Sequence, residues 1–285
     1  MKMNLSIDIG GTKIRFALVK DNQVVKSSEF FNNVKNYKEN ILKIKTTFDQ
    51  WAEKVEFIGI ACPGPLDIKS GKIYNSPNLE DWNNKNLKEE FGSVFQVWDI
   101  RINNDANVAA LGQFNVRHDL HSLLYFTIST GIGCGMIIDQ KIYNGFTGTA
   151  CEIANSFPDL DFGTAKSGIE YFASGKNIAL KLQSLGVSVK DTKTAFEMYY
   201  AKTNQIVNEY FAKIKQKLVV MFATAIYFLN PEIVVVGGSV AMHNQEWFEE
   251  IFAEVIKVTQ DINYQTKFEF AKDLDESTFI GCANL

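Results

Sequence analysis

The chain is poor in arginine and carries no net positive charge. Only three of its 29 basic residues are arginines, Arg15, Arg101 and Arg117, and the formal net charge at pH 7 is −4. A nucleic-acid partner needs a basic face that neutralises phosphates, so this composition argues against such a partner. Any recognition of a small phosphate compound must then depend on lysines, backbone N–H groups and helix N-termini.

Cysteine is also scarce, and its positions are scattered. The four cysteines, Cys62, Cys134, Cys151 and Cys282, form no C-x-x-C pair and suggest no disulfide framework. We therefore expect reduced thiols and a cytoplasmic protein. The N-terminus has no cationic segment followed by an apolar stretch, so we expect no signal peptide. The longest apolar run, 218–229, is too short to span a bilayer and predicts a buried core helix instead.

The sequence does contain an alternating pattern of strands and helices. Its 285 residues are 46% hydrophobic, which is enough for a large core. The expected strands are at 4–19 (two strands about a glycine turn), 23–30, 56–61, 95–102, 123–129, 136–138, 141–143 and 233–236. The expected helices are at 36–53, 103–114, 167–185, 191–229 and 246–258, before a last strand and helix. The order βββαβ recurs from Leu123, which predicts two related lobes with a cleft between them.

A glycine pair interrupts the first two strands, in the segment LSIDIGGTKIRFAL. The turn at 10–13 presents backbone N–H groups without side chains, a concavity that attracts anions, and Thr12 adds a hydroxyl donor. Asp8 lies just before this turn, and a buried carboxylate beside an anion site needs a cation between them. Mg²⁺ on a nucleotide phosphate would supply that cation. The alternative is a glycine-rich hairpin in which Asp8 is hydrogen-bonded locally.

Two further glycine clusters follow, STGIGCG at 129–135 and VVVGGSV at 234–240. The first lies between strands. The second follows a strand and can hold a sugar–base moiety against bare backbone. Each cluster alone is weak evidence, because none matches the Walker pattern or the full dinucleotide fingerprint. Together the three clusters indicate a nucleotide site.

The ordered motifs resemble those of a known family. The segments DIGGTK, ACPGPLD, NSPNLEDW, NDANVAALG, STGIGCGMIIDQKIYNGFTGTACEIAN and VVVGGS look like those of the ROK family of sugar kinases. The resemblance implies an α/β protein with a two-lobed, actin-like ATPase (ribonuclease H-like) fold that closes on ATP and a sugar. It implies a small lobe at 1–108, to which a C-terminal helix at 276–285 can return, and a larger lobe at 109–275. It also implies a homodimer.

The same resemblance assigns the nucleotide site, with ATP and Mg²⁺ as cofactors. The residues expected to grip the phosphates are Gly10, Gly11, Thr12, Lys13, Thr130, Gly131 and Gly133. The residues expected to line the adenosine pocket are Gly237 and Gly238, and Asp8 is expected to face the magnesium ion.

Asp105 is the expected catalytic base. The segment NNDAN at 103–107 ends a strand and starts a helix, so Asn104 or Asp105 could simply cap that helix. Capping uses one side-chain oxygen, so the two roles are compatible. In ROK kinases the matching Asn and Asp bind the sugar, and the Asp is the base. An ordinary aspartate, with a pKa of about 3.9, is ionised at neutral pH, and a positioned base contributes about 10²–10⁴ in rate.

The resemblance also nominates a sugar pocket, and one departure from it predicts that zinc is absent. The expected sugar-binding residues are Gly64, Asn78, Asn104, Asp105, Glu152, Asn155 and Glu170. Asn155 stands where the family usually has the His that, with three Cys, holds a structural zinc. Between Asn155 and Glu170 the sequence has neither His nor Cys, so the ligands for zinc are missing. The residues expected to pack this segment instead are Phe157, Pro158, Leu160 and Phe162. Glu170 has an alternative role as a solvated first-turn carboxylate.

The expected function is that of an ATP-dependent hexose kinase, a phosphotransferase acting on the 6-hydroxyl of glucose or of an N-acetylhexosamine such as N-acetylmannosamine. The alternatives are a β-glucoside kinase, a fructokinase and a catalytically silent sugar-binding protein. A sugar-responsive repressor is disfavoured, because DIGGTK begins at Asp8 and leaves no room for a preceding helix-turn-helix domain. No membrane or nucleic-acid partner is expected.

Overall fold

The computed structural model describes residues 3–76, 78–156, 168–260 and 264–285. The chain divides into two compact units. The first comprises Met1–His121, Gly135–Ala150 and Lys272–Leu285, and the second comprises Ser122–Cys134 and Cys151–Ala271. Both units combine helices with strands, which confirms the α/β class. The lobe boundary expected after residue 108 stays a prediction. Within the described ranges, no helix has the length and apolar character needed to cross a membrane.

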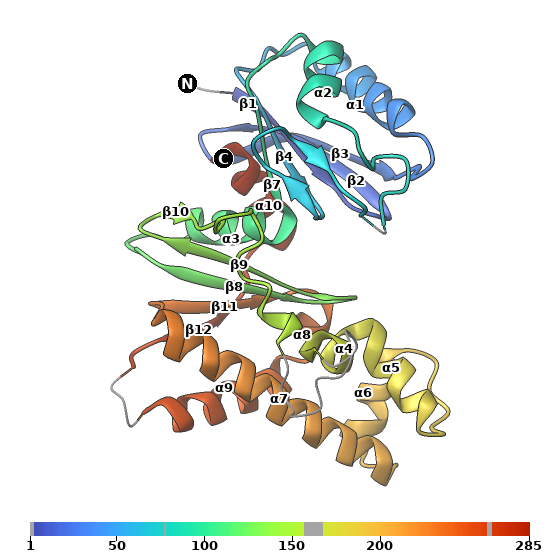
Figure 1. Ribbon diagram of the computed structural model, residues 1–285, viewed down its shortest axis with the longest axis vertical. Coiled ribbons are helices and arrows are strands. Elements are labelled where there is room, and N and C mark those ends of the chain that lie inside the picture. The colour runs from blue at the N-terminus through green and yellow to red at the C-terminus, as the bar shows by residue number, and fades with distance from the viewer. Residues whose placement is uncertain (1–2, 77, 157–167, 261–263) are drawn as a thin grey trace. The chain divides into compact units, whose positions relative to one another are not determined.

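The first unit contains a five-stranded sheet of order β3-β2-β1-β4-β7 (Figure 1). Its strands are β1 (Met3–Ile9), β2 (Lys13–Lys20), β3 (Gln23–Phe31), β4 (Ile58–Cys62) and β7 (Ile100–Asn104). The first three form an antiparallel meander, whereas β1, β4 and β7 are parallel. Asp21 and Asn22 both adopt positive φ, at 50° and 59°. A two-residue hairpin turn needs this conformation to match the right-handed twist of its strands. The short strands β5 (Leu66–Asp67) and β6 (Lys72–Ile73) form a separate ribbon.

Helices cover both faces of this sheet. They are α1 (Tyr37–Trp51), α2 (Leu87–Phe95), α3 (Asp105–Asn115) and α10 (Leu274–Ala283). Side chains alternate between the faces along a strand. Ile7 of β1 belongs to the same buried core as Ile44 of α1, whereas Ser6 donates a 2.8 Å hydrogen bond to the carbonyl of Phe279 in α10. Asp8, two residues beyond Ser6, therefore faces α10 as well.

Glycines let α3 and α10 pack backbone to backbone. A Cβ at Gly112 would lie 1.8 Å from the carbonyl oxygen of Ser277, and one at Gly281 would lie 2.1 Å from that of Val108. No larger residue fits at either position without moving a helix. The start of α3, which carries Asp105, is thus held in place by the C-terminal helix.

The predicted start of one strand was wrong. The segment expected to be a strand at 95–102 begins with the end of α2, and β7 starts only at Ile100. Asn86 caps α2 by accepting from the N–H groups of Lys88 and Glu89. Phe91 and Phe95 lie on the buried face of the helix. The apolar residues after Phe91 resemble a strand in sequence, but their helical spacing buries them against the sheet.

The second sheet has the order β10-β9-β8-β11-β12. Its strands are β8 (Leu123–Ile128), β9 (Ile132–Ile138), β10 (Lys141–Ile142), β11 (Ile233–Gly237) and β12 (Lys267–Phe270). Strand β11 runs parallel to both β8 and β12. The hairpin predicted about Asp139 and Gln140 is confirmed, and both residues adopt positive φ.

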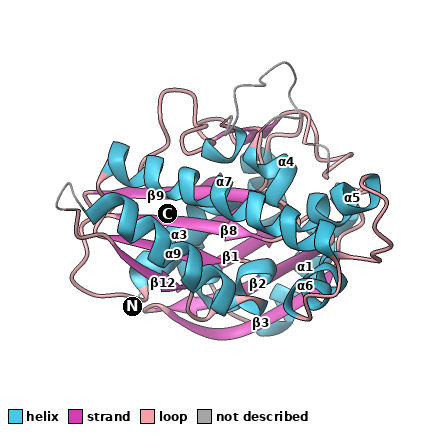
Figure 2. Cartoon of the chain, turned by 90° about the horizontal axis from the view of Figure 1, so that it is seen from below, coloured by secondary structure: helices cyan, strands magenta, loops and turns pink. Residues whose placement is uncertain are grey.

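The second unit also supplies most of the helices. They are α4 (Ile169–Ala173), α5 (Gly175–Ser184), α6 (Thr192–Tyr200), α7 (Gln205–Leu229), α8 (Ser239–His243) and α9 (Gln245–Thr259), with a 3-10 turn at Ile153–Asn155. Figure 2 shows α7 and α9 side by side, and they contact each other. Phe222 of α7 is fully buried and meets Phe126 of β8 edge to face at 4.9 Å. The core helix predicted from the apolar run at 218–229 is confirmed.

Candidate functional site

One group of predicted site residues lies where three parallel strands of the first unit end. In β1, Asp8 pairs in register with Ala61 of β4, and Cys62 pairs with Asn104 of β7. The carboxyl ends of β1, β4 and β7 therefore lie next to one another. In parallel α/β sheets this edge is where ligands bind.

The DIGGTK turn is tight at both of its glycines. The N–H of Gly10 donates to the carbonyl of Lys13 at 2.9 Å, and a Cβ at Gly10 would lie 2.9 Å from that same oxygen. A Cβ at Gly11 would lie 3.0 Å from the Cβ of Asn78. The structure thus places Asn78, predicted to bind sugar, against the turn predicted to bind phosphate.

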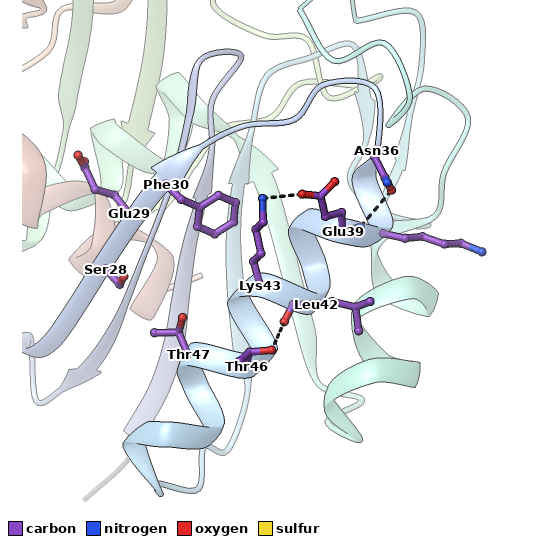
Figure 3. A pocket seen from close by; sticks show the side chains of 10 residues that line it. Ser28, Glu29, Phe30, Asn36, Glu39, Leu42, Lys43, Thr46 and Thr47 are labelled. Carbon is purple, nitrogen blue, oxygen red and sulfur yellow. Dashed lines mark hydrogen bonds and ion pairs between the residues drawn. The ribbon is translucent and has the colours of Figure 1, made fainter.

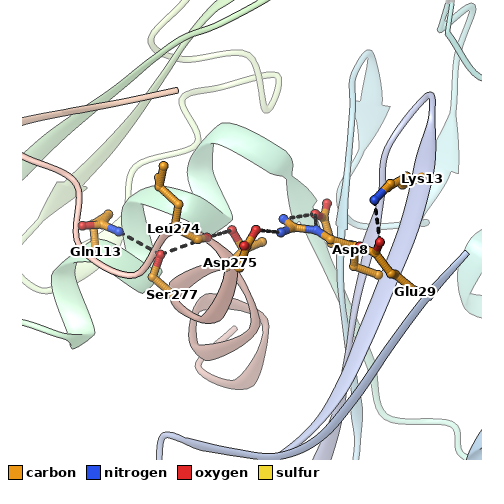
Figure 4. A network of polar contacts seen from close by, with 9 residues as sticks. Asp8, Lys13, Glu29, Gln113, Leu274, Asp275 and Ser277 are labelled. Carbon is orange, nitrogen blue, oxygen red and sulfur yellow. Dashed lines mark hydrogen bonds and ion pairs between the residues drawn. The ribbon is translucent and has the colours of Figure 1, made fainter. Parts of the chain in front are cut away.

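Lys13 and Asp8, on the two strands that flank this turn, both form ion pairs with other side chains (Figure 4). Lys13 Nζ lies 2.5 Å from Glu29 Oε1, with both side chains about half exposed, and such an exposed pair is weak. Asp8 accepts from Arg15 Nε at 3.0 Å and from Nη2 at 2.6 Å, and Arg15 Nη1 also pairs with Asp275. Burial raises the pKa of Asp8 above its ordinary value, although Arg15 opposes this.

These contacts correct the argument from which magnesium was predicted at Asp8. The cation that a buried carboxylate needs is already supplied by Arg15, from the opposite strand of the same hairpin. The negative charge of Asp8 is therefore compensated without a metal. This agrees with the alternative interpretation, in which Asp8 is hydrogen-bonded within the hairpin. Its role at a nucleotide-bound magnesium stays a prediction.

Asn104 and Asp105 stand at the junction of β7 and α3. Asn104 caps the helix by accepting from the N–H of Ala106 at 2.9 Å, and Asp105 Oδ1 accepts from the same N–H at 2.8 Å. Asp105 is exposed. A Cβ at Gly64 would lie 3.5 Å from Asn104 Nδ2, so the structure brings three predicted sugar-site residues together: Gly64, Asn104 and Asp105.

The Cys62 thiol lies at the same strand ends as the carboxylates of Asp8 and Asp105. Its thiol is fully buried, and burial is the largest cause that raises its pKa. The negative charges of Asp105 and Asp8 raise that pKa further. Both carboxylates therefore act on the same buried sulfur at the ends of β1, β4 and β7.

Two buried amides behind Asp105 were missed in the sequence analysis. Asn103 Oδ1 accepts from the N–H of Asn104 at 2.8 Å and from Asn107 Nδ2 at 3.0 Å. Asn107 Nδ2 also lies 3.4 Å from Asn144 Oδ1. Both Asn103 and Asn107 are almost completely buried. These amides fix the backbone from which Asn104 and Asp105 project. The repeated asparagines of the segment NNDAN at 103–107 were the feature of the sequence that could have indicated this role.

Another group of predicted site residues surrounds the STGIG turn of the second unit. Glu170 Oε2 accepts from the N–H of Ile132 at 2.8 Å, and a Cβ at Gly131 would lie 3.0 Å from this oxygen. The N–H of Gly175, at the start of α5, donates to the carbonyl of Ser129 at 2.7 Å. Glu170 thus braces the turn that contains Thr130 and Gly131, and Gly133 follows in strand β9. The hydrogen bond from Ile132 occupies one of the two carboxylate oxygens of Glu170.

Glu152 and Asn155 lie near this carboxylate. Asn155 Nδ2 donates to Glu152 Oε2 at 3.0 Å. Burial, and secondly the negative charge of Glu170, raise the pKa of Glu152 above its ordinary value. Three predicted sugar-binding side chains of the second unit are therefore neighbours. The predicted packing of Phe157, Pro158, Leu160 and Phe162 lies outside the described residues.

A cavity of about 810 Å³ in the second unit joins two of the three glycine clusters. Thr130 of the STGIG turn lines it, as do Ser239 and Val240, which follow Gly237-Gly238. Gly238 has φ of +88°, and a Cβ there would lie 2.5 Å from the carbonyl oxygen of Ile128. A side chain at this position is excluded, so the chain can turn sharply from β11 into α8 beside the cavity.

A second hollow of about 600 Å³ lies in the first unit between β3 and α1 (Figure 3). Its lining includes Glu29, Phe30, Glu39 and Lys43, and Lys43 forms an ion pair with Glu39 at 2.6 Å. None of the predicted site residues lines this hollow, so we do not assign it to the site. No cluster of three His, Cys, Asp or Glu side chains within the described ranges is arranged to hold a metal ion.

Comparison with known proteins places this geometry in a family. The family model described as "ROK family" matches residues 4–285. The chain is 28% identical to an uncharacterized protein of Clostridium perfringens, over 93% of this chain and 91% of that protein. It is 28% identical to a putative xylose repressor of a Caldicellulosiruptor species, over 79% of this chain but only 61% of the repressor. It is 25% identical to a glucokinase of Thermotoga maritima, over 88% of this chain and 86% of the kinase.

Solved structures agree with this result. The ROK hexokinase of Thermus thermophilus superposes with a TM-score of 0.87 at 21% identity, covering 99% of this chain and 96% of that one. A ROK glucokinase of Streptomyces griseus, solved with glucose and AMPPNP, superposes with a TM-score of 0.75 at 20% identity, covering 99% and 98%. At these identities the likeness shows the fold. Together with the family match over nearly the whole chain, it establishes that this protein belongs to the ROK family and has the actin-like ATPase fold of ROK sugar kinases.

Proposed function

We propose that this protein is an ATP-dependent sugar kinase that phosphorylates the 6-hydroxyl of glucose or of an N-acetylhexosamine such as N-acetylmannosamine. The observation that carries the proposal is the position of Asp105, exposed at the end of β7 and beside Asn104 and Gly64. The similarity to a glucokinase, and to N-acetylmannosamine kinases at about the same identity, supports this choice of substrates.

In the proposed reaction Asp105 is the general base. Its carboxylate accepts the proton of the sugar hydroxyl as that oxygen attacks the terminal phosphorus of ATP. Because phosphoryl transfer depends mainly on positioning and on compensation of phosphate charge, a rigidly held base is an advantage. The buried amides of Asn103 and Asn107 provide that rigidity. Magnesium on the nucleotide would neutralise phosphate charge, and the roles proposed for Asp8 and the turn at 10–13 are to face the metal ion and to bind the phosphates.

The nucleotide is proposed to bind in the 810 Å³ cavity of the second unit. Gly237 and Gly238 would leave room for adenosine beside Ser239, and Thr130 would direct a hydroxyl donor toward the phosphates. A volume of this size falls in the range typical of small-ligand sites. The remaining phosphate contacts in this unit are assigned to Gly131 of the same turn and to Gly133 near the start of β9.

The sugar is proposed to contact Gly64, Asn104 and Asp105 in the first unit. Glu152 and Asn155 of the second unit are proposed as further hydroxyl partners. Asn155 can donate and accept hydrogen bonds but cannot titrate, unlike the His usual at this position. We further propose that the protein acts in the cytoplasm as a homodimer, without zinc, membrane or nucleic acid.

The test is a coupled ADP-release assay with Mg-ATP and a panel of glucose, N-acetylmannosamine, fructose and a β-glucoside. We expect turnover with glucose or N-acetylmannosamine. Asp105→Asn should lower kcat by about 10²–10⁴-fold, while the sugar still raises the melting temperature. Asp139→Asn is the matched control, because Asp139 is exposed in a hairpin turn with φ of 47°, which asparagine tolerates. Full activity of Asp105→Asn would refute the base assignment.

A second candidate is a sugar-responsive protein without kinase activity, favoured by the similarity to xylose repressors. The chain spans 61% of the length of those relatives. Under this alternative, a sugar would raise the melting temperature in the presence of a non-hydrolysable nucleotide, but no sugar of the panel would release ADP. Turnover with any hexose of the panel would exclude it.

A further inference from the structure

We propose that Thr192, Tyr200 and His243 make the cavity of about 810 Å³ select a purine base with an amino group at ring position 6 over one with an oxo group there. All three side chains line this cavity, and all three belong to the second unit. The inference rests on the proposed function, since it takes the cavity as the nucleotide site. It goes beyond that function by naming the side chains that distinguish one base from another.

His243 brings a hydrogen-bond acceptor to the wall of the cavity. It lies one helical turn after Ser239 in α8, and its Nδ1 lies 2.7 Å from the carbonyl oxygen of Ser239. A carbonyl oxygen can only accept a hydrogen bond, so Nδ1 carries the ring hydrogen. In the neutral imidazole the other nitrogen, Nε2, then has no hydrogen and can only accept. This acceptor is one helical turn from Ser239, beside which adenosine is proposed to lie.

Tyr200, at the end of α6, is fixed as an acceptor by Asn244. The Nδ2 atom of Asn244 donates to the carbonyl oxygen of Val240 at 2.7 Å, which orients the amide. The Oδ1 atom of Asn244 accordingly accepts from the hydroxyl of Tyr200 at 3.2 Å. A tyrosine hydroxyl has a single hydrogen, so the lone pairs of its oxygen are what remain for a ligand.

Thr192, at the start of α6, has the same arrangement. Its hydroxyl donates to the carbonyl oxygen of Gly175, and a threonine hydroxyl also has only one hydrogen. Thr192, Tyr200 and His243 have therefore each given their single polar hydrogen to the protein. Each of them keeps lone pairs for a ligand, so the three form a set of acceptors.

The charged donors of the cavity suit another part of the nucleotide. Lys176, Lys190 and Lys193 line the cavity, and all three are exposed. The backbone N–H of Lys176 donates to the carbonyl oxygen of Thr130 at 3.2 Å, so Lys176 lies beside the turn assigned to the phosphates. An ammonium group pairs better with a phosphate than with a neutral base. The base is therefore left to the uncharged side chains.

A set of acceptors distinguishes the two kinds of purine. The cavity wall also contains Ala179 and Val240, whose apolar side chains suit the flat faces of a base. Adenine has an amino group at position 6, which donates, whereas guanine has an oxo group there, which accepts. The amino group satisfies the acceptors of the wall. An oxo group would bring lone pairs against lone pairs and leave both partners without a hydrogen bond.

The test is calorimetric titration of the full-length protein with Mg²⁺ and ADP, GDP or IDP at pH 8, where histidine is neutral. IDP has the 6-oxo group of GDP but lacks its 2-amino group, so it isolates position 6. We expect ADP to bind about 10-fold more tightly than IDP. Equal affinities would overturn the inference and leave the proposed kinase intact. A preference for ADP without turnover of any sugar would support the inference and refute the kinase. If none of the three binds, both are refuted.

Variants of His243 identify the residue responsible. His243→Ala should reduce the preference for ADP over IDP to about 2-fold, and His243→Arg, which replaces an acceptor by donors, should abolish or invert it. The control is His118→Arg, which makes the same change at an exposed histidine of the first unit, outside the cavity. It should keep the wild-type preference. An unchanged preference in both His243 variants, or an equal weakening of ADP and IDP, would overturn the assignment.

Discussion

Replacing Arg15 with methionine should destabilise the protein strongly and in a pH-dependent manner. The Asp8 side chain is 16% exposed and that of Arg15 is 24% exposed, so the pair is mostly removed from water. Methionine keeps much of the packing of the arginine stem but leaves the Asp8 carboxylate without its partner. Breaking one side of a buried pair costs about 3–5 kcal/mol. Because these groups are not fully buried, we expect a loss of about 3 kcal/mol at pH 7.

The sign of the pH dependence follows from the pKa of Asp8. This pKa already lies above its ordinary value, because burial outweighs the attraction of Arg15. A folded-state pKa above the unfolded one means that stability falls as pH rises through that pKa. Removing Arg15 raises the pKa further, so Arg15→Met should lose more stability at pH 7 than at pH 5. Asp275 should add little, since its side chain is 89% exposed.

The measurement is urea unfolding at pH 5 and pH 7 of wild type, Arg15→Met and the double variant Asp8→Asn/Arg15→Met. The double variant removes the stranded charge and should regain most of the loss. At pH 7, 3 kcal/mol corresponds to a fall in melting temperature of roughly 6–12 °C. A loss below about 1 kcal/mol, or an equal loss at both pH values, would refute the argument that Arg15 compensates a buried carboxylate.

Three further outcomes are expected. Gly112→Ala should lower the free energy of unfolding by about 1–3 kcal/mol or more, because its Cβ would meet the backbone oxygen of Ser277 at 1.8 Å. The variant should therefore unfold at a markedly lower urea concentration, and wild-type stability would contradict the close packing of α3 on α10. Glu170→Gln should lower the pKa of Glu152 by removing the neighbouring charge while still accepting from Ile132. The acid limb of sugar KM against pH should then move to lower pH, and an unmoved limb would exclude Glu152 as the group observed. EDTA should abolish turnover until Mg²⁺ is restored, whereas a zinc-selective chelator should change neither turnover nor melting temperature; a loss with the latter would reveal a zinc site.

Many elements of the fold could be predicted from short local sequence patterns. The glycine turn between β1 and β2, the hairpins at 21–22 and 139–140, and the helix that follows Asn104 depend on neighbours a few residues away. These elements could be predicted because turn and capping chemistry is local. Helix α2 could not, because the apolar residues near Phe95 fit a strand as well as a helix, and only burial against the sheet separates the two.

Short motifs were enough to nominate the candidate site residues, but most of the partners of these residues could not be predicted from the sequence. The Asp8–Arg15 pair could have been foreseen, because a tight hairpin at 10–13 sets these residues opposite each other. Asp275 could not, since it is 260 positions from Arg15 in the chain. Glu170 was predicted to bind sugar, yet the fold brings its carboxylate to the N–H of Ile132.

The sequence by itself determined the family, the α/β class, the glycine turns and the carboxylate at position 105, because each is written in a short contiguous motif. Only the tertiary structure decided which charges are compensated and which glycines let α3 and α10 touch. The physical reason is that burial and pairing depend on segments brought together from distant parts of the chain, and their energies exist only once those segments have packed.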